Sequence, residues 1–121
     1  MRLKKVRIVV EGVDATSRRW AEAFKGKRPL RGVGAVISVP SWEVLGRVLS
    51  PPRLEILAAV PVLLPPSIAA LARALKRDFK NVHADVKFLA DIGLLELHEE
   101  GARRTLVPTA LYSEIDVPLA A

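Results

Sequence analysis

Polar side chains gather on one side of the helix that the sequence predicts over residues 78–91. Apolar residues recur there at spacings of three and four, which is typical of one buried stripe: Phe79, Val82, Val86 and Leu89. The face away from that stripe offers two ammonium groups, an amide and an imidazole around one small residue: Lys80, Asn81, His83, Ala84 and Lys87. In the DNA major groove such groups can meet base edges and phosphates. The pattern therefore suits a helix that lies in the major groove.

Each candidate also has a structural interpretation, and both stay open from sequence alone. The Asn81 amide can bond adenine twice, or it can be solvated at the third helical position if Asp78 caps the helix. His83 can contact DNA or be an ordinary surface histidine. Arg77 can contact phosphate or pair with Asp78 or Asp85. The two lysines are predicted phosphate contacts, because a point charge needs little geometry.

Composition argues against several other kinds of site. The 121 residues include no Cys and two His, so we expect no disulfide and no metal site. The chain has no nucleophile–base constellation and no phosphate-cradling glycine loop, so we expect neither enzyme activity nor a cofactor. The longest apolar stretch, 56–64, is far too short to span a membrane. We therefore expect a soluble, cytoplasmic protein without membrane contact.

The net charge of +6 is unevenly distributed along the chain. Residues 1–48 hold 11 Lys/Arg against 4 Asp/Glu, a balance of +7, whereas residues 92–121 hold 2 against 5, or −3. A basic balance favours polyanion partners, although an ordinary solvated surface explains it equally well. The basic loop 25–34 could be a further nucleic-acid arm or a surface for an acidic partner; we favour a solvated loop.

Capping and turn signals predict the elements that hold these residues. Strands are expected over 4–13 and 36–39, with a short helix ending near residue 24 between them. Ser41 is expected to cap a helix through Val48, and Ser67 another. A helix starting at Ser50 and the next two prolines is expected to stop near Pro61 and to bury Leu54, Leu57 and Ala58.

Beyond residue 93 the chain alternates as strands do. Residues 94–98 and 103–107 flank a turn and predict a hairpin, and 111–119 predicts another strand that could pair with the N-terminal one. Arg103 and Arg104 belong to this hairpin. They could contact DNA, or they could form an ion-pair ladder with Glu99 and Glu100.

Three segments carry a resemblance: PSWEVLGRVLSPPRLEIL (40–57), SIAALARALKRDFKNVHADVKFLADIGLLEL (67–97) and VPTALYSEIDV (107–117). The chain resembles winged helix-turn-helix transcriptional regulators of the MarR-like type, and most closely the prokaryotic predicted antitoxins with a helix-turn-helix domain. The resemblance implies an α+β, mainly α fold: a winged helix-turn-helix over 40–121 with a small strand–helix extension over 1–39. It also implies a homodimer that binds double-stranded DNA and represses its own operon.

The resemblance also implies roles for particular residues. Ser67 matches the start of the first helix of the motif, and Arg77 its turn. The exposed side of the family's recognition helix corresponds to Lys80, Asn81, His83 and Lys87. The family's basic wing corresponds to Arg103 and Arg104. Family members usually carry Gly at the position of Lys76, which implies a positive φ there, and often Arg at that of Ala84.

The runner-up interpretation is an antitoxin-type module that neutralises a partner toxin, with DNA binding secondary; Lys76 and Ala84 are the departures that favour it.

Overall fold

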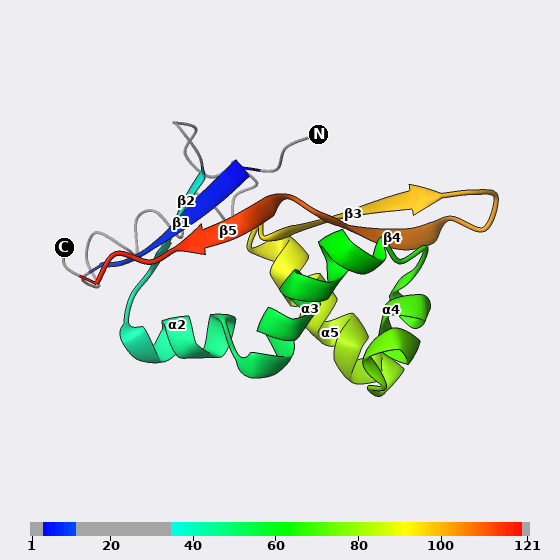
Figure 1. Cartoon of the computed structure of the whole chain (residues 1–121), viewed down its shortest axis with the longest axis horizontal. Coiled ribbons are helices and arrows are strands. Elements are labelled where there is room, and N and C mark those ends of the chain that lie inside the picture. The colour runs from blue at the N-terminus through cyan, green and yellow to red at the C-terminus, as the bar shows by residue number, and fades with distance from the viewer. Residues whose placement is uncertain (1–3, 12–34, 120–121) are drawn as a thin grey trace. The chain divides into compact units, whose positions relative to one another are not determined.

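The computed structural model describes residues 4–11 and 35–119 (Figure 1). Contacts divide the chain into two units. Unit 1 comprises residues 1–50 with 112–121, and unit 2 comprises 51–111. The helix predicted to end near residue 24 and the basic loop 25–34 lie outside the described residues. The predicted boundary lies at 39/40, whereas here residues 40–50 and the C-terminal strand both belong to unit 1.

Unit 1 is built on a parallel sheet of three strands. β1 (Lys4–Val10) lies between β2 (Ala35–Val39) and β5 (Tyr112–Asp116). Ile8 pairs with Ile37 of β2, and Arg7 pairs with Asp116 of β5. The predicted pairing of the C-terminal strand with the N-terminal strand is therefore confirmed.

Alternation along β1 separates the core of this sheet from its polar face. Val6 and Ile8 are fully buried, whereas Arg7 between them is exposed and bonds Asp116 through its Nε at 2.9 Å. Such alternation is the strand periodicity of two. Burial raises the pKa of the Tyr112 phenol in β5 above its ordinary value of 10.0.

The helix of unit 1 begins where its capping signal predicts. α2 (Trp42–Val48) contacts β2, and the Ser41 hydroxyl accepts the Val44 N–H at 3.1 Å. A β-region serine that accepts this bond satisfies one of the free N–H groups of the first turn. Trp42, the first residue of α2, is 50% exposed and does not belong to the core.

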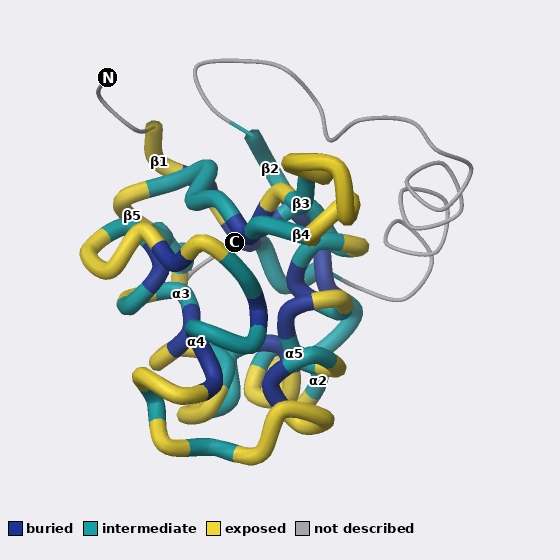
Figure 2. The backbone as a smooth tube through the Cα atoms, turned by 90° about the vertical axis from the view of Figure 1, so that its right-hand side faces the viewer, coloured by how far each residue is buried: buried dark blue, intermediate teal, exposed yellow. Residues whose placement is uncertain are grey.

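Unit 2 contains three helices and a hairpin. They are α3 (Pro51–Leu63), α4 (Ile68–Leu75), α5 (Phe79–Asp91), β3 (Leu95–Glu100) and β4 (Thr105–Ala110). β3 and β4 pair antiparallel, as the predicted hairpin requires, and α4 packs against α5. Buried stretches recur along both of these helices (Figure 2). The core of unit 2 consists of branched aliphatic side chains and one alanine: Ile56, Val60, Ile68, Leu71, Ala72, Val82, Val86, Leu89, Leu94 and Leu95.

The predicted buried side of α3 is wrong. Leu54 is 42% exposed and Ala58 is exposed, whereas Ile56 and Val60 are buried. The helix also includes Pro61, which was expected to stop it. Apolar residues occur all around α3, so periodicity gives no basis for choosing which side faces the core. The result is an exposed apolar surface at its C-terminal end: Val62, Leu63 and Leu64.

The predicted fold class, a mainly α winged helix-turn-helix with a small N-terminal extension, is wrong. The described chain is about 44% helix and 31% strand, with four helices and five strands in two sheets. One of those sheets is the parallel sheet of unit 1. Its central strand, β1, pairs with β2 and also with β5 from the other end of the chain, so the sheet joins segments far apart in the sequence.

Within the described residues, no single helix is long and apolar enough to cross a membrane. α3 and α4 meet that length and composition only as a pair, and they are bent by 110° at the break between them.

Candidate nucleic-acid interface

α5 has one buried side and one exposed side. Val82, Val86 and Leu89 are fully buried, which confirms three members of the predicted stripe, but Phe79 is 49% exposed, so its assignment to the core is wrong. The residues predicted to read DNA lie on the other side. Four of them are exposed and one is half-buried: Lys80, Asn81, Ala84, Lys87 and, half-buried, His83. Neither lysine forms an ion pair with another described residue.

A turn of three residues, Lys76 to Asp78, joins α4 to α5. Lys76 has φ 55° and ψ 44°, which is the left-handed conformation, and its N–H donates to the Arg73 carbonyl at 3.1 Å. The positive φ that the resemblance implied at this position is therefore confirmed. A left-handed residue at the end of a helix satisfies free carbonyls and redirects the chain.

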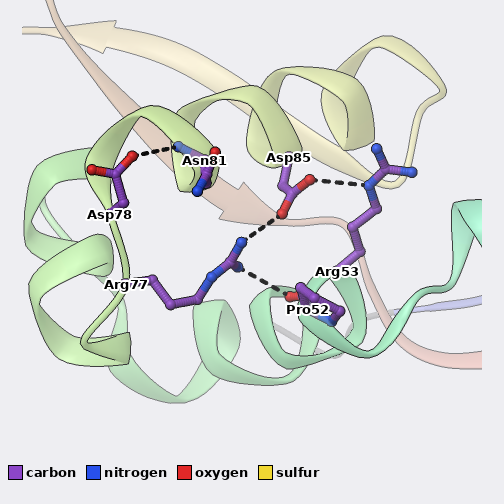
Figure 3. Close-up of polar contacts among 6 residues, drawn as sticks. All are labelled: Pro52, Arg53, Arg77, Asp78, Asn81 and Asp85. Atoms are coloured by element: carbon purple, nitrogen blue, oxygen red, sulfur yellow. Dashed lines mark hydrogen bonds and ion pairs between the residues drawn. The ribbon is translucent and has the colours of Figure 1, made fainter.

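Asp78 caps the first turn of α5. Its carboxylate accepts the backbone N–H of Asn81 at 3.3 Å (Figure 3). This contact uses the backbone of Asn81, so the exposed side-chain amide keeps its donors and acceptor. The cap therefore leaves base reading by Asn81 possible.

Arg77 faces α3 and α5. Its Nη2 donates to the Asp85 carboxylate at 2.9 Å, and its Nη1 donates to the Pro52 carbonyl at 3.5 Å. Arg53 of α3 donates to the other oxygen of the same carboxylate at 3.2 Å (Figure 3). In the structure, Arg77 therefore pairs with Asp85, which was one of the two interpretations that the sequence left open.

The cluster of Arg53, Arg77 and Asp85 is largely shielded from water. Their side chains are 22%, 22% and 17% exposed, respectively. The Arg53 guanidinium also lies over the Phe88 ring, 3.9 Å from its centroid, in a cation–π contact. This cluster ties α3, the turn and α5 together. Sequence reasoning missed Arg53, because 32 residues separate it from Asp85 and no local pattern relates the two.

The hairpin presents two arginines at its turn. β3 and β4 pair as far as Glu100 with Thr105, so Arg103 and Arg104 lie beyond the paired residues, and both are exposed. No ion pair between described residues joins them to Glu99 or Glu100, so the predicted ladder is absent there. Glu100 instead contacts the His98 Nε2 at 2.7 Å.

Ser67 has the capping role expected from its position. Its hydroxyl accepts the Ala70 N–H at 3.0 Å and starts α4. A hydroxyl used in this way still has a proton and a lone pair for a phosphate. Among the described His, Asp and Glu side chains, no group of three is placed to hold a metal ion.

These observations define a class: a small protein of two units that combines a parallel sheet with a helical unit, and whose α5 exposes cations and an amide. The chain belongs to the HVO_A0114 family, whose model matches residues 48–117. That match includes all of unit 2 and the strand β5. No curated protein and no solved structure matches the chain. The family name states no activity, so the resemblance to MarR-like regulators stays a prediction.

Proposed function

We propose that this protein is a sequence-specific DNA-binding regulator of transcription that uses α5 as its recognition helix. The observation that carries the proposal is the exposed face of α5. It presents Lys80, Asn81, Ala84 and Lys87 on the side opposite the buried stripe. In many DNA-binding proteins the second of two turn-linked helices lies in the major groove.

The chemistry of this face supports a division of roles. Lys80 and Lys87 supply the charge that phosphates attract, and counterion release then makes binding salt-dependent. Asn81 supplies an amide that can bond adenine with two hydrogen bonds. Ala84 lies between the lysines, and its small side chain leaves room for the helix to approach the base edges.

Arg103 and Arg104 support a second point of contact. Both are exposed at the turn of the hairpin, and no described carboxylate pairs with them. Arginines on a protruding turn can bind phosphates beside the groove or insert into a narrow minor groove.

A homodimer, a cytoplasmic location and repression of the protein's own operon complete the proposal. The homodimer is proposed because such regulators read two half-sites that lie one helical turn apart on DNA. The repressor role rests on the resemblance of residues 67–97 and its flanking segments.

The test compares salt dependence between variants. Wild-type protein and the double variant Lys80→Ala/Lys87→Ala are titrated with duplex DNA from the region upstream of the gene, at several salt concentrations. We expect the double variant to lower the slope of log K against log salt by about 2, because each phosphate contact contributes about 0.9.

The matched control is Arg47→Ala, which removes an exposed cation of α2. Its slope should equal that of the wild type. Failure of the wild-type protein to bind duplex at low salt would refute the proposal, and an unchanged slope in the double variant would remove both lysines from the interface.

A further inference from the structure

Phe79 is the first residue of α5 and stays at the surface. Its side chain is 49% exposed, although its spacing puts it on the stripe that buries Val82, Val86 and Leu89 completely. An exposed Phe leaves apolar area in water that burial would stabilise by about 25 cal/mol per Å². A ligand that covered the ring would recover that stabilisation.

The His83 ring packs beside the Phe79 ring. Phe79 and His83 are one helical turn apart along α5. Their ring centroids are 5.5 Å apart, and the angle between the ring planes is 41°. Aromatic pairs prefer such tilted or offset arrangements over a face-to-face sandwich. The contact restricts the rotation of the Phe79 side chain, so less entropy would be lost when the ring contacts a ligand.

Phe79 and His83 border the face proposed for DNA. Residues three and four apart on a helix are neighbours, so Phe79 lies beside His83, and His83 beside Lys80 and Lys87. The ring is therefore in the first turn of α5, at the edge of the face that carries the lysines. N-terminal residues of a recognition helix are those that contact base edges.

We propose that Phe79, oriented by His83, contacts the C5-methyl group of a thymine in the major groove. This inference rests on the proposed function. The Phe79 side chain has no hydrogen-bond donor or acceptor, and thymine is the only standard base that presents a methyl group in the major groove. The bound site thus carries a thymine opposite the first turn of α5. His83 is a positioning residue.

The test removes the methyl group without changing base pairing. Full-length protein selects duplexes from a random pool, and each thymine of the selected site is then replaced by deoxyuridine. We expect one replacement to weaken wild-type binding about fourfold, the value of one buried methyl-sized group. Phe79→Ala should bind the thymine and deoxyuridine sites equally, whereas Phe79→Leu should keep most of the difference.

Three further variants separate this role from a general effect on folding. Val62→Ala removes exposed apolar surface from α3, where Val62 is 78% exposed, and should keep the full fourfold difference. His83→Ala should reduce the difference in affinity between the thymine and deoxyuridine sites. His83→Tyr should restore that difference, because a second aromatic ring can again orient Phe79.

The outcomes distinguish the two proposals. If the wild-type protein selects no duplex, the proposed function fails, and this inference fails with it. If it selects a duplex but no deoxyuridine replacement distinguishes wild type from Phe79→Ala, only the inference is overturned. If Phe79→Ala weakens binding to the single strand and to the duplex by the same factor, the inference is also overturned. That result would indicate that Phe79 stacks on an unpaired base.

Discussion

Two pairs of cations in unit 2 differ in what they can bind. Lys80 and Lys87 are exposed on α5, and neither forms an ion pair with a described residue. Arg53 and Arg77 are about one-fifth exposed and share the carboxylate of Asp85. The position of a single carboxylate, that of Asp85, decides which cations hold the fold together and which remain available to a polyanion.

The helical geometry of α5 explains this division. Successive residues are 100° apart around a helix, so Asp85 lies about 140° from Lys80 and about 160° from Lys87. Asp85 therefore faces α3 and the turn, while the lysines face away from them. A surface electrostatic contact also weakens with salt far more than a shielded one, so the two groups should respond differently to ionic strength.

The largest expected effect comes from removing Asp85. Asp85→Ala removes the carboxylate that two largely shielded guanidinium groups, Arg53 and Arg77, share, and we expect the free energy of unfolding in urea to fall by about 2–3 kcal/mol. Asp91→Ala is the matched control on the same helix, since Asp91 is exposed. It should change stability by less than about 0.5 kcal/mol. Equal effects of the two substitutions would mean that the cluster contributes nothing.

Asn81 provides the next test, because its backbone and side chain have separate roles. Asn81→Ala should relax preference at one base pair by about 1–3 kcal/mol while leaving stability nearly unchanged, since the N–H bonded to Asp78 remains. Competition binding against single-base variants of the site measures the base preference, and urea unfolding measures the stability. Asp78→Ala should instead lower stability by about 1 kcal/mol through loss of the cap. Unchanged base preference in Asn81→Ala would exclude Asn81 from base reading.

The smallest effect concerns Lys76, whose charge and conformation can be separated. Lys76→Gly should raise the free energy of unfolding by about 1 kcal/mol, because glycine adopts φ 55° without the clash of a Cβ. Arg73→Gly, in the last turn of α4, should lower it by about 1 kcal/mol and serves as the opposite control. If Lys76→Gly also reduces the salt slope of DNA binding, Lys76 belongs with Lys80 and Lys87.

Local signals predicted much of the element structure. Ser41 and Ser67 start helices where their hydroxyls predicted, and the hairpin and the C-terminal strand are present. These features depend on contacts within three or four residues or on strand alternation, which a sequence displays directly. The prediction for α3 failed because apolar residues occur all around that helix, so their spacing does not indicate which side is buried.

The sequence by itself determined the exposed face of α5 and the caps that begin the helices, since both follow from short-range spacing. The tertiary structure alone decided the parallel direction in which β1 pairs with β5, the exposure of Phe79 and the contact of Arg53 with the carboxylate that Arg77 also binds. Those features join residues tens of positions apart or depend on where the core ends. Such contacts arise only when packing brings distant segments together, and no local pattern encodes them.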